Sequence, residues 1–406
     1  MLKLARSVSA YAALPLVGLL TGPLLARLLG PEGRGVLAAV QQPLSLVEGL
    51  AALGAPAAAT YFVARGVSAR AVVRVLLPLS LAGGGIAFLA LAIWDVAVLR
   101  GLGAPIWLLL VVHATVTLGA VINLRRGVLG GLGAMSTLDA ERVAQALLRL
   151  MTIAGLWLLV VADGVLVAGA LALSGLIGSM VLWRRGIGHH SHDAAITHVA
   201  RGAAWRYAGA AWFGSIAISA NARLDQAVLP LIADLEVLGF YAVAVTLAEV
   251  PLVLGTVLYR NVFQQAGGGQ PFSAAIRQVG LAVGCAALLC LVLGVIVSWI
   301  VPVFFGEDFV PSVGATRVLA TGTVLNVLMA GLAAWLSGKG HPGRASSAYL
   351  TSMALSAVGL FMIRGGAEVV EVAVVSVIAS LGGCIVAGCL VTLERTTVGA
   401  RAGHRA

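Results

Sequence analysis

The sequence predicts an all-α integral membrane protein with twelve transmembrane helices in two lobes of six. Of its 406 residues, 60% are hydrophobic and only 10% are charged, whereas soluble domains carry about 25% charged residues. The apolar residues form continuous runs of roughly 20, the length that crosses a bilayer as a helix. The basic residues gather in alternate loops. These observations exclude a soluble enzyme, a disordered chain and a disulfide scaffold.

The expected spans are separated by clusters of charged and turn-forming residues. The fifth run contains Arg149, so its guanidinium must snorkel to the interface or face a cavity. Membrane β-strands are excluded, because a barrel needs alternating segments of about ten residues rather than continuous apolar runs. The spans are 7–26, 37–63, 75–94, 105–124, 143–162, 164–183, 207–230, 239–259, 279–302, 314–337, 346–363 and 370–392.

The loops predict the orientation. With the N-terminus inside, 20 of the 26 Lys and Arg residues fall in cytoplasmic segments and five on the opposite side, with Arg223 in mid-span. Because positive residues are retained on the cytoplasmic side, both termini are expected there. The net charge of +10 therefore reflects topology, and no nucleic-acid partner is expected.

The polar stretch 184–206 divides the spans into two halves. We expect an N-terminal lobe (1–183), a cytoplasmic linker (184–206), a C-terminal lobe (207–392) and a cytoplasmic tail (393–406). An even number of spans per lobe keeps both lobes in the same orientation. This predicts a parallel repeat about an axis along the membrane normal, with the site between the halves.

Two segments carry a family resemblance. The first is 26–36 (Ala-Arg-Leu-Leu-Gly-Pro-Glu-Gly-Arg-Gly-Val), and the second is 221–226 (Asn-Ala-Arg-Leu-Asp-Gln) with 238–244 (Leu-Gly-Phe-Tyr-Ala-Val-Ala). Both resemble the Wzx-type polysaccharide flippases for O-antigen and exopolysaccharide. These flippases belong to the superfamily of multidrug, oligosaccharidyl-lipid and polysaccharide exporters.

The resemblance implies a V-shaped bundle of two six-helix lobes that opens alternately to each side of a bacterial cytoplasmic (inner) membrane. The implied substrate is an undecaprenyl-pyrophosphate-linked oligosaccharide, moved from the inner to the outer leaflet within membrane lipid. Polymerase and glycosyltransferase partners are implied as well.

The chemistry of such a substrate requires buried cations. Arginine suits a pyrophosphate, because its guanidinium stays charged and binds phosphate bidentately. Arg223 is the first candidate because it lies in mid-span, although an ion pair with Asp225 or Glu249 would also explain it. The other substrate-binding candidates are Arg27 and Arg34, otherwise solvated turn charges; Arg65 and Arg149, otherwise topology residues; and Asn221 and Gln226, otherwise helix-packing groups.

Carboxylates inside spans are candidates for energy coupling. Glu48, Asp225 and Glu249 lie within expected helices, where an ionised acid is costly and tends to titrate. They fit proton or sodium coupling, or else internal ion pairs. The chain lacks a phosphate-binding glycine loop followed by Lys-Ser/Thr. We therefore expect no ATP hydrolysis, no cofactor, no metal and no enzymatic activity.

Three other functions remain open. A cation-coupled exporter of drugs or metabolites would use the same fold, and fold does not fix substrate. A lipid II flippase is a second alternative, although such proteins usually carry two additional helices. A membrane polymerase or ligase is a third, but it is expected to have a large outer loop, and every outer loop here is short.

Overall fold

The computed structural model describes residues 2–184, 186, 198–268 and 270–403. The chain divides into two compact units, Met1–Ser219 and Ala220–Ala406, and each is described by itself. Most of the expected linker 184–206 lies outside the described residues, so the lobe boundaries expected from the sequence stay predictions. The described residues are helical throughout apart from turns and loops, as the composition predicts.

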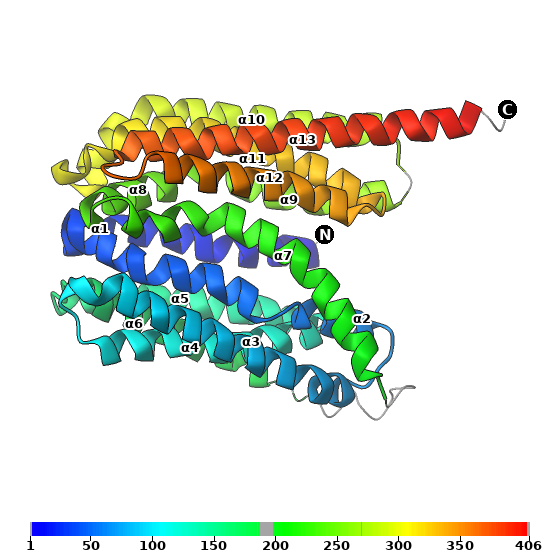
Figure 1. The fold of residues 1–406 in the computed structure, drawn as a ribbon, viewed down its shortest axis with the longest axis horizontal. Coiled ribbons are helices and arrows are strands. Elements are labelled where there is room, and N and C mark those ends of the chain that lie inside the picture. The colour runs from blue at the N-terminus through cyan, green and yellow to red at the C-terminus, as the bar shows by residue number, and fades with distance from the viewer. Residues whose placement is uncertain (1, 185, 187–197, 269, 404–406) are drawn as a thin grey trace. The chain divides into compact units, whose positions relative to one another are not determined.

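The N-terminal unit is an all-helical bundle (Figure 1). Its helices α3 and α4 lie side by side, and α1 packs along α5. The helix α7 begins in this unit and continues past its end. The bounds are α1 (Leu2–Ala51), α2 (Ala55–Ala64), α3 (Ala69–Ala97), η1 (Leu99–Leu102), α4 (Ile106–Gly131), α5 (Met135–Leu158), α6 (Gly164–Ser179), η2 (Met180–Arg184) and α7 (Arg201–Val228).

The long helix α1 is two helices joined by a kink at Gly30. Gly30 has φ 66° and ψ −179°, a conformation essentially restricted to glycine. Pro31 follows it, and proline disfavours helical geometry in the preceding residue while fitting the first position of a new helix. The Gly30–Pro31 pair therefore ends one helix and starts the next within a single residue.

Small residues let the helices of this unit approach closely. A Cβ atom built on Gly127 of α4 would lie 2.3 Å from the carbonyl oxygen of Pro56 on α2. The hydroxyl of Thr60 donates to the Gly127 carbonyl oxygen over 2.9 Å. Backbone contact and a side-chain hydrogen bond thus join α2 to α4, the kind of interface that small residues form inside membranes.

The C-terminal unit is built around α11. This helix packs against α8, α9, α10, α12 and α13, and Figure 1 shows it alongside α13. Val327, Ala333 and Leu336 of α11 are fully buried. The bounds are η3 (Leu229–Leu231), α8 (Leu235–Ala248), α9 (Leu252–Gly267), α10 (Phe272–Ile300), η4 (Val301–Phe305), η5 (Glu307–Phe309), α11 (Ser312–Gly338), α12 (Pro342–Met362) and α13 (Val369–Gly403).

Seven helices among the described residues are long and apolar enough to cross a membrane. The number rises to nine if each of two bent pairs is one span. The pairs are Val17–Ala51 with Ala55–Ala64, bent by 41°, and Leu235–Ala248 with Leu252–Gly267, bent by 56°. The chain is therefore a multi-pass membrane protein, and the arrangement of twelve spans in two lobes stays a prediction.

The exposed surface of α10 is suited to lipid. Its span has a mean hydropathy of 2.8, and Leu281, Leu291, Val295 and Trp299 are largely exposed. Contiguous exposed apolar side chains are rare on soluble monomers. Hydrocarbon is the solvent that such a helix face requires.

Candidate functional site

Two of the predicted arginines come together in the N-terminal unit. Arg34 follows the Gly30 kink on α1, and Arg149 lies on α5, which packs along α1. The positive charge of Arg149 lies within Coulombic range of the Arg34 guanidinium. In both residues the Nε atom is buried and has no hydrogen-bond partner among the described residues.

These two arginines also lack an acidic partner in the described part of the chain. Neither forms any of its ion pairs. Charges buried in proteins are normally paired or hydrogen-bonded, because their desolvation is costly. Two like charges held together with unused N–H groups make a site that an anion would stabilise, and phosphate oxygens match the guanidinium geometry.

Arg27 and Arg65 do not join this pair. Both side chains are exposed. The guanidinium of Arg65 lies 4.3 Å from the ring centroid of Tyr61, and Tyr61 stacks on Tyr207 at 4.3 Å. A cation over an aromatic ring at the end of a short helix is typical of residues at a membrane interface.

Arg223, the first candidate from the sequence, has a partner. Its Nη1 atom donates to Glu249 Oε1 over 3.1 Å, and each side chain keeps 34% of its surface exposed. Glu249 ends α8 at the break before Pro251. The ion pair thus links α7 to the bent α8–α9 segment. An ion pair with Glu249 is one of the two alternatives to substrate binding that the sequence suggests for Arg223.

Asp225 is held by hydroxyl groups. The buried Tyr241 hydroxyl donates to Asp225 Oδ2 over 2.5 Å, and the Ser376 hydroxyl donates to the same oxygen over 3.2 Å. The carboxylate thereby joins α7, α8 and α13. Nearby Gln226 is buried, and its Nε2 atom has no partner among the residues that the structure describes, whereas Asn221 is half-buried.

Glu48 is the predicted coupling residue without a partner. It forms no hydrogen bond or ion pair with any described residue, and it packs against bare Gly119 of α4. The positive charge of Arg126 is within Coulombic range of it. The role of Glu48 in energy coupling stays a prediction.

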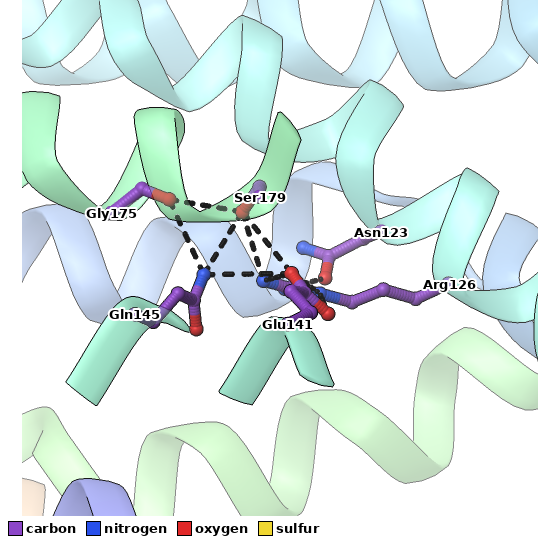
Figure 2. A network of polar contacts seen from close by, with 6 residues as sticks. All are labelled: Asn123, Arg126, Glu141, Gln145, Gly175 and Ser179. Atoms are coloured by element: carbon purple, nitrogen blue, oxygen red, sulfur yellow. Dashed lines mark hydrogen bonds and ion pairs between the residues drawn. The ribbon is translucent and has the colours of Figure 1, made fainter. Parts of the chain in front are cut away.

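A polar network at one end of the N-terminal unit was not predicted from the sequence (Figure 2). Glu141 on α5 accepts from Arg126 Nε and Nη2 of α4 at 2.9 and 2.7 Å. Ser179 on α6 donates to Glu141 Oε1 over 3.1 Å, and Gln145 donates to Ser179 over 2.9 Å. Glu141 and Gln145 are four residues apart and share a helix face, which is the signal that the sequence offered.

A second polar pair was also missed. His113 of α4 and Asp95 of α3 are both completely buried and in contact. The sequence offered a signal for this pair. His113 lies inside the expected span 105–124, and Asp95 directly follows the expected span 75–94. Ionisable residues within membranes are rare and usually functional or paired.

The C-terminal unit carries a pocket lined by carboxamides. It has a volume of about 300 Å³ and lies at the end of α9. The Gln265 Oε1 atom is buried and has no hydrogen-bond partner in the described part of the chain. Carboxamides both donate and accept, so they match the hydroxyl groups of a sugar without adding charge. The lining residues are Asn261, Gln264, Gln265, Gly268 and Gln270.

Solved structures show what fold the chain shares. An inward-facing multidrug resistance MATE family transporter of the MOP superfamily matches with a TM-score of 0.70 and 15% identity, covering 96% of this chain and 99% of that one. The lipid II flippase MurJ in an inward closed conformation matches with a TM-score of 0.70 and 12% identity, covering 96% and 87%. At these identities the likeness is one of fold.

Sequence comparison identifies the family. A search of curated protein sequences finds no significant match. The sequence profile described as "Polysaccharide biosynthesis protein" matches residues 6–262, which is more than half of the 406 residues. The chain therefore belongs to the polysaccharide biosynthesis protein family.

Proposed function

We propose that the protein is a membrane flippase that moves an undecaprenyl-pyrophosphate-linked oligosaccharide from the inner to the outer leaflet by alternating access. The observation that carries this proposal is the pair of half-buried arginines, Arg34 and Arg149, whose buried Nε atoms have no hydrogen-bond partner among the described residues. A pyrophosphate carries more than one negative charge, so a single buried cation would leave part of that charge uncompensated.

The family match and the carboxamide pocket support the same substrate class. Proteins of polysaccharide biosynthesis handle sugars, and the pocket at Gln265 offers neutral donors and acceptors. Arg223 is proposed as a further phosphate-binding group that exchanges Glu249 for the substrate. Arg27 and Arg65, as exposed cations, are proposed to attract the anionic headgroup, and Asn221 and Gln226 to contact sugar hydroxyls.

The test is flipping of fluorescent undecaprenyl-pyrophosphate oligosaccharide in proteoliposomes. Arg34→Gln and Arg149→Gln should each slow flipping at least about tenfold, equivalent to ~1.4 kcal/mol. Lysine at either position should restore part of the rate, because it keeps the charge but loses the bidentate geometry. The matched control is Arg100→Gln, an exposed arginine on η1, which should leave the rate unchanged.

The substrate panel separates the alternatives. Lipid II carries the same pyrophosphate on a different glycan, and an organic cation carries no phosphate. If the protein flips lipid II and no other substrate, it is a lipid II flippase. Export of cations with no dependence on Arg34 or Arg149 would favour a drug or metabolite exporter and would refute the proposal.

A further inference from the structure

The His113–Asp95 pair is sealed inside the N-terminal unit. Both side chains have 0% exposure. The His113 Nδ1 atom lies 2.8 Å from Asp95 Oδ1 and 2.9 Å from Oδ2. Only Oδ2 has hydrogen-bond geometry, so Oδ1 has no hydrogen-bond partner among the described residues. On the other side of the ring, Nε2 lies 3.1 Å from the carbonyl oxygen of Val40 on α1.

In the described part of the chain, no other charged side chain forms an ion pair or hydrogen bond with His113 or Asp95. Of the elements that pack near this pair, α6 (Gly164–Ser179) contains no ionisable side chain. The helix α1 contributes Glu48, which lies further along α4 against Gly119, and Arg34, which lies six positions before Val40 and forms no ion pair with Asp95. The element η1 contributes Arg100, whose side chain is exposed. The helix α5 meets the other end of α4 through Glu141, already paired with Arg126.

The hydrogen bonds fix the number of protons. The Val40 carbonyl can only accept, so Nε2 must carry a proton. Nδ1 and the Asp95 carboxylate then share one further proton, which makes the pair neutral whether it resides on nitrogen or on oxygen. Without it, a carboxylate with 0% exposure would hold an uncompensated negative charge, which is very costly away from water. The sealed pair therefore retains its proton.

We propose that His113 and Asp95 form an occluded proton-binding site whose proton is exchanged only when the N-terminal unit opens to water. Binding and conformation are then linked, because loss of the proton favours a hydrated, open arrangement and gain of the proton favours the sealed one. Such linkage is reciprocal, so whatever opens the unit releases the proton. The Val40 contact extends this link to α1, the helix that carries Arg34 and Glu48. Coupling of this site to lipid-linked sugar rests on the proposed function, whereas the site itself does not.

The key variant is Asp95→Asn. The asparagine amide can donate to Nδ1 while Nε2 still donates to Val40, so every hydrogen bond is preserved and the pair is neutral without the shared proton. We expect a thermal midpoint close to that of the wild type. Asp95→Ala is the comparison, because it leaves a void and an unpartnered ring nitrogen and should lower the midpoint.

Two measurements test the proposal independently. Nitrogen-15 NMR of the His113 ring with infrared spectroscopy of the Asp95 carboxyl should show, from mildly acidic to mildly alkaline pH, either an imidazolium or a protonated acid. A neutral ring beside an ionised carboxylate would overturn the site, whatever the substrate proves to be. In proteoliposomes, a pH gradient should accelerate flipping by the wild type but not by Asp95→Asn.

The outcomes are distinguishable. If Asp95→Asn retains the wild-type response to the gradient, the pair is a structural contact and the coupling is refuted. If the wild type flips no lipid-linked sugar at all, the proposed function fails, and the spectroscopic result still decides the proton site.

Discussion

At the scale of single residues, charge pairing separates the arginines. Arg126 and Arg223 pair with Glu141 and Glu249, whereas the buried Nε atoms of Arg34 and Arg149 have no partner among the described residues. The sequence could identify which arginines lie inside spans. It could not identify their partners, because Arg126 and Glu141 lie on different helices, and side-chain contacts between helices depend on their rotation and register.

The same limit explains the missed pair of His113 and Asp95. These residues are eighteen positions apart on two helices, and the span expected at 75–94 ends just before Asp95. The hydrophobic periodicity of one helix does not indicate which face of a neighbouring helix it contacts. Only the packed arrangement of α3, α4 and α1 brings the two side chains together.

We predict that Arg126→Ala lowers the free energy of unfolding by about 3 kcal/mol, the low end for breaking a buried ion pair. Glu141 is only 3% exposed in the intact pair and would lose its cation, whereas the 31% exposure of Arg126 moderates the loss. Thermal unfolding in detergent measures it. Adding Glu141→Gln should recover part of the stability, and Arg100→Ala should stay within about 0.5 kcal/mol of the wild type. Equal midpoints for Arg126→Ala and Arg100→Ala would contradict the prediction.

For Arg223, a double-mutant cycle separates folding from transport. Arg223→Ala and Glu249→Ala should each lower stability, and the double variant should lose less than their sum, because the second change removes an already unpaired group. The two side chains are one-third exposed, so the coupling should be about 1 kcal/mol. If Arg223 also binds the substrate, the double variant should fold well and still flip slowly. Wild-type flipping by the double variant would leave Arg223 a packing residue.

At the scale of elements, the turn at Gly30 shows how far sequence reasoning reaches. The run Gly-Pro-Glu-Gly-Arg-Gly indicates a break between helices, and the structure has the kink there. The expected spans ended at 26 and resumed at 37, whereas helix continues on both sides of Gly30. The expected spans leave Glu32 and Arg34 in the turn between two helices, although Arg34 is also a substrate-binding candidate. Both are good helix formers, and Pro31 starts a helix well.

We predict that Gly30→Ala destabilises the protein by about 1–3 kcal/mol. A Cβ atom at position 30 would meet nothing within 4 Å, so the whole cost arises from a backbone conformation that alanine disfavours. Gly18→Ala is the matched control, because its Cβ also meets nothing within 4 Å and no positive φ occurs there. Alanine at 18 should be neutral or stabilising by up to about 1 kcal/mol. Identical unfolding midpoints for the two variants would show that the kink carries no strain.

At the scale of the whole molecule, composition predicts a membrane protein. It does not predict how the membrane spans are divided and arranged. A hydrophobic content of 60% with 10% charge requires a bilayer, and the helices with exposed apolar faces agree with it. Hydropathy alone divides bent segments poorly, as the 56° bend between α8 and α9 shows, so the count of twelve spans stays a prediction. In the proposed function, substrate recognition depends on a few charged residues, and these residues contribute little to the overall composition.

The orientation of the whole chain is the last prediction. The 20-to-5 distribution of Lys and Arg between alternate loops should keep both termini and Lys339 in the cytoplasm, because translocating clustered positive charge is unfavourable. Single cysteines introduced at Lys339 and at Glu307, in a variant with Cys285, Cys290, Cys384 and Cys389 replaced by serine, provide the test. In intact cells an impermeant thiol reagent should label the cysteine at 307 and spare the one at 339. The reverse pattern would invert the topology. Labelling at both positions would place them on the same side of the membrane and contradict the single span expected between them.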